Sequence, residues 1–265
     1  MAKINLDKYY TPDSLAKYCV DKVKEVLWDE TITEWLEPSA GNGAFLPYLD
    51  NNYLAFDLEP EHEMVEKKDY LTLDIPYFKG RCIVGNPPFG SGNTLSVKFF
   101  KNSLKYGDFI AFILPASQYN NNQQMYEFDL FHSEMLEITK YSGINLQCCF
   151  NIYKRPLNGL NEKPFDYKLK DVTVLEWRRG SSYSIPNTYH LGICAWGASI
   201  GKEIKYQWQF AREMYIQVKN CVFKEAILEK MKQADWKKIH LSISAPSLSQ
   251  WKIYKYLREQ IPELR

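Results

Sequence analysis

Short apolar segments alternate with amphipathic ones along the first 140 residues of the chain. After Pro12, apolar residues recur at steps of three and four, which predicts a helix with one buried face. Thr11 suits its N-cap and Pro12 its first helical position. Its apolar positions are Leu15, Tyr18, Cys19, Val23, Val26 and Leu27. Strands are predicted at 32–36, 53–57, 81–84 and 108–114, and a second helix at 95–106.

Strands that alternate with helices indicate βαβ units, and therefore an α/β fold with a doubly wound, mostly parallel sheet. In such sheets the ligand lies beyond the carboxyl ends of the strands. Each loop of unusual composition follows a predicted strand at that end, so we expect these loops to converge on one crevice. The loops are 37–43, 57–60, 69–71 and 85–89.

The pattern changes after about residue 140, where a mixture of strands and helices is predicted. Residues 154–170 are rich in Lys, Pro, Asn and Gly, which is typical of a loop. We therefore expect two domains, the α/β domain over residues 1–155 and a small, basic α+β region over residues 156–265. Further strands are predicted at 146–153, 171–179 and 189–196, and helices at 222–231 and 249–257.

The two halves of the chain carry opposite charge. Residues 1–140 hold 13 Lys and Arg against 21 Asp and Glu, whereas residues 141–265 hold 20 against 11. A basic C-terminal half suits a polyanion such as nucleic acid, although its cations could simply solvate helices. The six cysteines form no C-x-x-C pair, and with only four histidines we expect neither a metal site nor disulfides, and hence a reducing cytoplasm. No apolar run approaches the roughly 20 residues that cross a bilayer, so no membrane contact is expected.

The loop from Glu37 to Gly43 contains two glycines, which let a backbone approach a ligand closely. The phosphate-binding pattern G-x-G-x-x-G is not met, because residue 46 is Leu. A tight strand-to-helix turn without a ligand is the alternative. Asp57 ends the next predicted strand, where doubly wound folds place an acid that accepts hydrogen bonds from ribose hydroxyls. It could also cap the segment that follows.

Asn86-Pro87-Pro88-Phe89 is the most specific motif of the chain. Its two prolines fix two φ angles and remove two N–H donors, which leaves a rigid loop whose carbonyls lack local partners. An amide followed by rigid carbonyls forms an array of acceptors for an exocyclic amine. Phe89 adds a face on which a base can stack. A plain turn that closes the strand is the alternative, which the flanking amide and aromatic ring disfavour.

In their order along the chain, Glu37 to Gly43, Asp57, Asp69-Tyr70 and Asn86 to Phe89 resemble the S-adenosylmethionine-dependent amino-methyltransferases. Tyr10-Thr11-Pro12 is similar to the N-terminal motif of the adenine-N6 DNA methyltransferases. The resemblance covers residues 9–115 well and residues 125–153 loosely. It implies a Rossmann-like, seven-stranded class I sheet, and methyl transfer from S-adenosylmethionine to the N6 amine of a flipped-out adenine. S-adenosylhomocysteine would be the other product, and the partner would be DNA, double-stranded, with no obligate protein partner.

Other substrates stay open, because the Asn-Pro-Pro-aromatic motif also occurs in ribosomal-RNA and protein-glutamine methyltransferases. An inactive module that binds the cofactor and docks nucleic acid is a third possibility. The Tyr-Thr-Pro motif and the basic C-terminal half favour DNA adenine.

The resemblance also implies roles for individual residues. Asn86 and the Pro87 carbonyl would hold the target amine, and Phe89 would stack on the base. Tyr141 is expected as the second stacking ring, with Phe165 or Tyr167 as alternatives. The implied cofactor contacts are Tyr10, Thr11, Pro12, Glu37, Pro38, Ala40, Gly41, Gly43, Asp57, Leu58, Asp69, Tyr70 and Asn86. Candidate DNA contacts, for which turns and solvated side chains are the alternative, are Lys154, Arg155, Arg178, Arg179 and Lys202.

Overall fold

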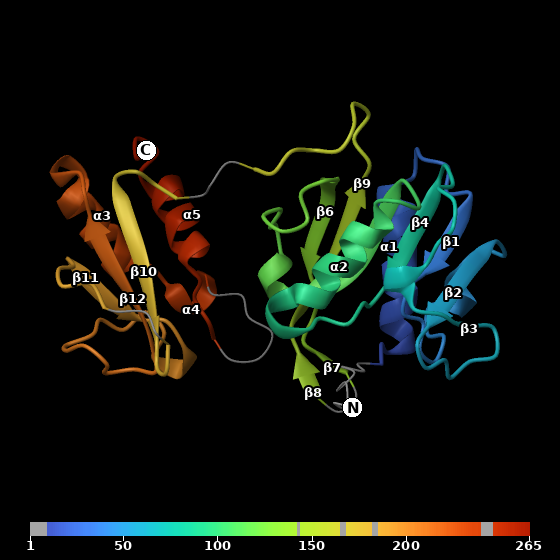
Figure 1. Cartoon of the computed structure of the whole chain (residues 1–265), viewed down its shortest axis with the longest axis horizontal. Coiled ribbons are helices and arrows are strands. Elements are labelled where there is room, and N and C mark those ends of the chain that lie inside the picture. Colours follow the sequence, from blue (N-terminus) through green and yellow to red (C-terminus); the bar gives the residue numbers. More distant parts are fainter. Residues whose placement is uncertain (1–9, 142–143, 165–167, 182–184, 240–245) are drawn as a thin grey trace. The chain divides into compact units, whose positions relative to one another are not determined.

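The computed structural model describes residues 10–141, 144–164, 168–181, 185–239 and 246–265, and only the backbone at 139–141 and 144. The chain folds into two compact units, residues 1–164 and 165–265 (Figure 1). Each unit has its own sheet and its own hydrophobic core. The division lies within the loop expected at 154–170. No helix in the described part of the chain is long and apolar enough to cross a membrane.

The first unit is built on a seven-stranded sheet in the order β3-β2-β1-β4-β5-β9-β6. All its strands run parallel except β9, which pairs antiparallel with both β5 and β6. The expected Rossmann-like, mostly parallel sheet of seven strands is thus confirmed. The strands are β1 (Glu34–Glu37), β2 (Tyr53–Asp57), β3 (Glu66–Lys67), β4 (Arg81–Gly85), β5 (Phe109–Pro115), β6 (Asp129–Met135) and β9 (Cys148–Lys154).

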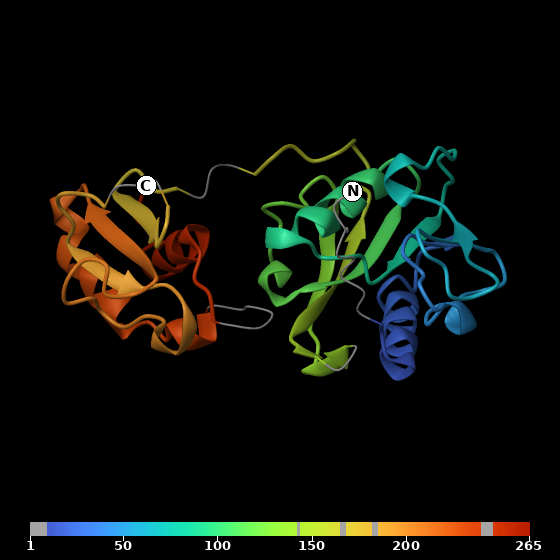
Figure 2. The ribbon, with the colours of Figure 1, turned by 60° about the horizontal axis from the view of Figure 1, so that its bottom comes forward.

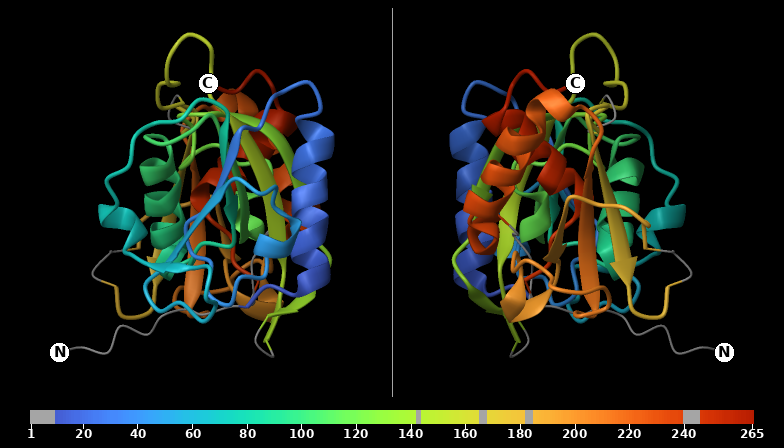
Figure 3. Two further views of the ribbon diagram at one scale, coloured as in Figure 1. Left: turned by 90° about the vertical axis from the view of Figure 1, so that its right-hand side faces the viewer. Right: turned by 90° about the vertical axis from the view of Figure 1, so that its left-hand side faces the viewer.

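Helices cover both faces of this sheet, α1 (Asp13–Val26) on one and α2 (Thr94–Ser103) on the other (Figure 3). Phe99 and Phe100 of α2 pack in one core cluster with residues of β4 and β5. Tyr18 was expected on the buried face of α1, but it is exposed and its hydroxyl donates to Glu134. The shorter elements are η1 (Leu46–Tyr48), η2 (Tyr70–Thr72), η3 (Ser91–Asn93), η4 (Ala116–Gln118) and the ribbon of β7 (Thr139–Tyr141) with β8 (Ile144–Leu146).

The second unit is the expected small α+β region. Its antiparallel sheet has the order β10-β12-β11, and helix α5 packs beside β10 (Figure 2). Its core joins one face of the sheet to α3 and α5. The elements are β10 (Val172–Arg178), β11 (Leu191–Cys194), β12 (Arg212–Val218), α3 (Lys224–Gln233), α4 (Trp236–Ile239), α5 (Gln250–Gln260), η5 (Gly197–Ser199) and η6 (Cys221–Phe223).

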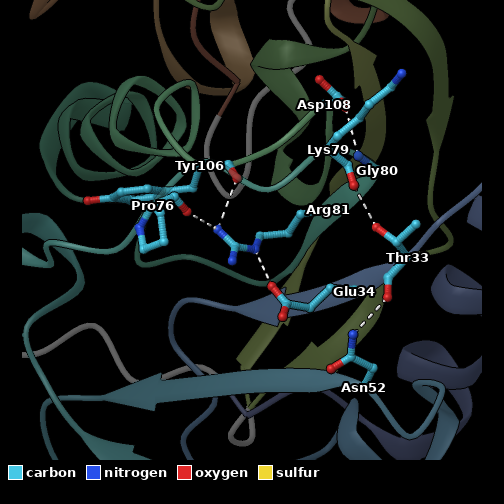
Figure 4. Close-up of polar contacts among 9 residues, drawn as sticks. All are labelled: Thr33, Glu34, Asn52, Pro76, Lys79, Gly80, Arg81, Tyr106 and Asp108. Carbon is cyan, nitrogen blue, oxygen red and sulfur yellow. Dashed lines mark hydrogen bonds and ion pairs between the residues drawn. The ribbon is translucent and has the colours of Figure 1, made fainter.

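A buried ion pair joins the amino ends of the central strands β1 and β4 (Figure 4). The loops of unusual composition follow the opposite, carboxyl ends of the strands. Arg81 at the start of β4 pairs with Glu34 at the start of β1. The Arg81 guanidinium also donates to the carbonyls of Pro76 (2.8 Å) and Tyr106 (3.0 Å). Asp108, just before β5, accepts from the Gly80 amide at 2.8 Å. A buried charge must be paired in this way, or its desolvation would destabilise the fold.

Candidate functional site

Hydrogen bonds join the loops at the carboxyl ends of β1, β2 and β4. The amide of Ala40 donates to the carbonyl of Phe56 at 2.9 Å, and the amide of Gly41 donates to Asp57 Oδ2 at 2.8 Å. Ser39 Oγ donates to the carbonyl of Asn86 at 3.4 Å. The structure therefore brings together three of the loops that the sequence predicts at one crevice. Ser39, which the sequence reasoning did not single out, is one of the links.

The glycines of the first loop are required by its backbone. Gly41 and Gly43 have φ angles of 51° and 78°, in the left-handed region that favours glycine. A Cβ on Gly43 would lie 2.9 Å from Cγ of His62, so a larger residue would displace that ring. The Glu61 amide also donates to the Gly41 carbonyl at 2.9 Å. The segment after β2 thus packs against this loop, which the sequence pattern did not indicate.

Glu37 at the end of β1 is a buried acid with an unpartnered oxygen. Its side chain is 2% exposed, and Oε2 has no hydrogen-bond partner among the described residues. Burial raises the pKa of Glu37 well above its usual value, and the nearby Asp57 carboxylate raises it further. A buried acceptor without a donor is costly, so this position fits a donor supplied by a bound molecule.

Replacement of Glu37 by Gln should stabilise the protein at neutral pH. Because the folded pKa of Glu37 lies above the unfolded value, the folded state holds a proton that the unfolded state releases. The wild type should therefore lose stability, relative to Glu37→Gln, as the pH rises from about 4 through the folded pKa. Urea unfolding across this range measures the difference. The exposed Glu25→Gln is the matched control, and a Glu37→Gln gain that is independent of pH would contradict the assignment.

Asp57 at the end of β2 shapes the glycine loop. Its Oδ2 accepts from the Gly41 amide and its Oδ1 from the Glu59 amide, both at 2.8 Å. Each carboxylate oxygen has two lone pairs, so the side chain retains acceptor capacity for hydroxyl groups. The next residue, Leu58, is exposed beside it and offers an apolar contact for a ring.

We expect Asp57→Asn to weaken binding of S-adenosylmethionine by about 10- to 100-fold. The amide nitrogen of Asn would face one of two backbone N–H groups, so one donor would lose its acceptor and the glycine loop would shift. Isothermal titration calorimetry measures the affinity, with the exposed Asp74→Asn as the matched control. Equal affinities of the two variants would remove Asp57 from the binding site.

Asp69 and Tyr70 lie in different environments, the first at a turn and the second in the core. Asp69 lies at the turn before η2, where its Oδ1 accepts from the Leu71 amide at 2.9 Å. The Tyr70 ring is buried in the core, stacks on Phe99 with 5.3 Å between centroids, and bonds through its hydroxyl to Ser103. The resemblance implied that this ring lies beside the cofactor, whereas the structure places it under α2. Asp69 remains a predicted acceptor.

The segment Tyr10-Thr11-Pro12 contacts the same loops. The structure gives Pro12 as the N-cap of α1, without a side-chain cap, so the prediction that Thr11 caps this helix is wrong. The buried Thr11 hydroxyl instead accepts from Nδ2 of Asn86 at 3.1 Å. Tyr10 donates its hydroxyl to Glu61 at 2.6 Å. These two bonds connect the start of the chain to the ends of β2 and β4.

The loop from Asn86 to Phe89 presents its acceptors at the end of β4. Because the nitrogen end of the Asn86 amide is bonded to Thr11, its Oδ1 is turned away from that residue. The Pro88 carbonyl accepts from Ser96 and the Phe89 carbonyl from the Leu95 amide. Among the described residues, nothing donates to the Pro87 carbonyl. The Phe89 ring is only 5% exposed, so a base could reach only part of its face.

The remaining candidates are less well placed. Tyr141 ends β7, but only its backbone is described, and Phe165 and Tyr167 lie outside the described residues. Lys154 forms an ion pair with Glu30. Arg155 pairs with Asp108 at 3.2 Å, donates to the Gly107 carbonyl at 2.9 Å, and lies against the rings of Tyr77 and Phe128. Both cations thus have structural partners in the first unit. Arg178, Arg179 and Lys202 are exposed in the second unit.

Comparisons with known proteins give only distant similarity. No protein-family model and no curated protein sequence matches the chain. A candidate RNA methyltransferase from Pyrococcus horikoshii aligns with 58% of this chain and 91% of its own, at 16% identity and a TM-score of 0.46. TrmN from Thermus thermophilus (52% and 48%, 14% identity, TM-score 0.40) and the 23S rRNA methyltransferase ErmE (58% and 72%, 12% identity, TM-score 0.43) are also similar. The order and direction of the seven strands, rather than these similarities, define the class I, Rossmann-like fold.

Proposed function

We propose that this chain is an S-adenosylmethionine-dependent methyltransferase that methylates the N6 amine of adenine in DNA. The observation that carries the proposal is the Asn86–Thr11 hydrogen bond, which directs the amide oxygen of Asn86 away from Thr11. The carbonyl of the next residue, Pro87, accepts no backbone hydrogen bond from the described part of the chain. Two neighbouring acceptors suit an amine with two hydrogens. These acceptors follow the carboxyl end of β4, where hydrogen bonds join their loop to the glycine loop after β1 and, through it, to Asp57 at the end of β2.

The residues at these strand ends fit S-adenosylmethionine. Gly41 and Gly43 keep the loop free of side chains, and Asp57 would accept from the ribose hydroxyls. Glu37 offers a buried acceptor, Oε2, which no described residue satisfies and which an ammonium or hydroxyl donor would satisfy. Leu58 and Asp69 would contact the adenine ring and its amino group. When bound, the cofactor supplies an electrophilic methyl group on a sulfonium.

Asn86 and Pro87 would activate the target amine without a strong base. The N6 lone pair of adenine is delocalised into the ring, so the amine is a poor nucleophile. Acceptors at Asn86 Oδ1 and the Pro87 carbonyl favour a pyramidal nitrogen and stabilise the positive charge that develops on it. Because the loop is rigid, these dipoles are preorganised, and losing one such partner typically costs about 10²–10³ in rate. Holding the amine in line with the methyl group adds the advantage of proximity.

DNA as the partner is supported by charge and by the chemistry of the site. The C-terminal half has an excess of nine positive charges, from 20 Lys and Arg against 11 Asp and Glu, which suits phosphate groups. An adenine must leave the base stack to reach a pocket of this kind, at a cost of a few kcal/mol. We expect double-stranded DNA as the substrate and no obligate protein partner.

The test is methyl transfer from labelled S-adenosylmethionine to unmethylated double-stranded DNA, single-stranded DNA, total RNA and a protein extract in parallel. Mass spectrometry then identifies the modified group. N6-methyladenine in DNA would support the proposal. Label in RNA or on glutamine would keep the roles of Asn86 and Pro87 but replace the substrate. Cofactor binding without any transfer would indicate an inactive binding module.

A further inference from the structure

Two motifs of the second unit are brought to one end of its sheet. Arg178 is the last residue of β10 and Arg179 follows it, and the loop from Trp196 to Lys202 follows β11. The central strand β12 begins at this end, because Arg178 is paired with Arg212 and Cys194 with Glu213. The amide of Arg179 donates to the Ala211 carbonyl, and the amide of Ala195 to the Arg212 carbonyl. We call this end, comprising Arg178, Arg179, Trp196, Lys202, Trp208 and Arg212, the sheet-end surface.

Two tryptophans of the sheet-end surface are open to solvent. Trp196 is 51% and Trp208 61% exposed, and neither indole makes a ring contact in the described part of the chain. Large aromatic side chains at a surface expose apolar area that folding would otherwise bury, so exposed pairs of this kind mark interaction sites. Neither tryptophan belongs to the hydrophobic core of this unit.

The exposed Trp208 has a strained backbone conformation. Trp208 has a φ of 64°, a backbone conformation that is unfavourable for a bulky residue. The buried Glu213 carboxylate maintains it by accepting from the amides of Trp208 (3.2 Å) and Phe210 (2.8 Å) and from the Tyr215 hydroxyl. A strained residue that is fixed by a buried acid and still presents its ring to solvent is suited to binding.

The charge of the sheet-end surface is positive. Glu176 is the acid beside it, and it is shared between Arg178 and Arg212. Burial acts to raise the pKa of Glu176, but the hydrogen bonds from both arginines outweigh it and hold that pKa below its usual value. Arg212 also donates to the Ser247 hydroxyl, and the backbone of Ser247 forms an isolated antiparallel β-bridge with Trp196. Arg178, Arg179, Lys202 and Arg212 against the carboxylates of Glu176 and Glu213 leave an excess of positive charge on the sheet-end surface.

We infer that the sheet-end surface binds unpaired nucleotides of a nucleic acid strand, with Trp196 and Trp208 stacking on bases and the arginines contacting phosphates. Aromatic rings flanked by Arg and Lys are the chemistry that recognises single strands, because every base has a face for stacking and every linkage carries a charge. This deepens the proposed function by naming a second contact for the nucleic acid. It does not depend on methyl transfer.

The test measures binding of the full chain, without cofactor, to a labelled oligothymidylate of about 12 nucleotides. Thymine has no exocyclic amine, so the loop at Asn86 makes no specific contribution. Each of Trp196→Ala and Trp208→Ala should weaken binding about tenfold, the order expected for one lost base stack. Trp28→Ala is the matched control, since Trp28 is 82% exposed in the first unit. It should leave the affinity unchanged.

Three further measurements separate the outcomes. An abasic strand of equal length should bind more weakly than oligothymidylate and be insensitive to the tryptophan variants. Arg178→Gln with Arg179→Gln should reduce the salt dependence of binding. Trp208→Asn should fold at least as stably as the wild type, because Asn tolerates positive φ, yet bind like Trp208→Ala. Unchanged oligothymidylate affinity in both tryptophan variants, or equal and tryptophan-dependent binding of polyglutamate, would overturn the inference. Neither result would bear on methyl transfer, which the parallel substrate assay reports.

Discussion

Asn86→Ala should lower the rate of methyl transfer by about 10²–10³ while S-adenosylmethionine still binds. The variant removes one of the two acceptors proposed for the target amine, and it removes the donor to Thr11. Single-turnover measurements with labelled cofactor give the rate, and calorimetry gives the cofactor affinity. The loss should therefore appear in kcat. Ordinary turnover by Asn86→Ala would exclude Asn86 from the reaction.

Thr11 provides the matched comparison for this effect. Its hydroxyl positions the Asn86 amide without touching the target amine in the proposed arrangement. Thr11→Val should therefore reduce kcat less than Asn86→Ala does, and Thr11→Ser, which keeps the hydroxyl, should restore it. If Thr11→Ser were as slow as Thr11→Val, the methyl group of Thr11 and not its hydrogen bond would be responsible.

Arg81→Met should destabilise the protein by about 3–5 kcal/mol, the largest effect on stability that we expect. The change would leave the carboxylate of Glu34 without its partner and the carbonyl of Pro76 without the Arg81 donor, at the buried end of the sheet shown in Figure 4. The Tyr106 carbonyl would lose one of its two donors and keep the Phe78 amide. Urea unfolding followed by circular dichroism measures the change in free energy.

Two variants control for the Arg81 prediction. Lys98→Met makes a similar change at an exposed position of α2 and should leave stability nearly unchanged. The double variant Arg81→Met/Glu34→Met removes the stranded charge and should recover part of the loss, because apolar residues can replace a buried ion pair. If the double variant lost more stability than the two single variants lose together, this explanation would be contradicted.

The central strands of the first unit were predictable because each contains a short run of apolar residues. β2 occupies residues 53–57 as predicted, and β4 and β5 end within one residue of their predicted bounds. β6 was not predicted. It is an edge strand and therefore half-exposed, so its sequence, Asp129–Met135, mixes charged and apolar residues. β12 was not predicted because it begins with the charged residues Arg212 and Glu213. Their charges are compensated by contacts that only the folded chain provides, Glu176 for Arg212 and the amides of Trp208 and Phe210 for Glu213.

Site residues were predictable as positions at strand ends, but their contacts were not. The bond between Thr11 and Asn86 spans 75 residues, and no local pattern encodes it. A serine, threonine or aspartate before a helix favours capping on local grounds, and only tertiary structure diverts Thr11 elsewhere. Likewise, Tyr70 follows a strand-end acid, yet the space beneath α2 decides that its ring points inward. The chemical type of a site residue can be read from the sequence, whereas the direction of its side chain depends on tertiary packing.

All strands of the seven-stranded sheet, and every residue proposed for the transfer step, precede residue 155. The sheet of the first unit is therefore complete before the second unit begins. In evolutionary terms, the two units are open to separate selection. If the proposed function holds, a lineage could exchange or diversify the second unit while inheriting the residues proposed for methyl transfer unaltered.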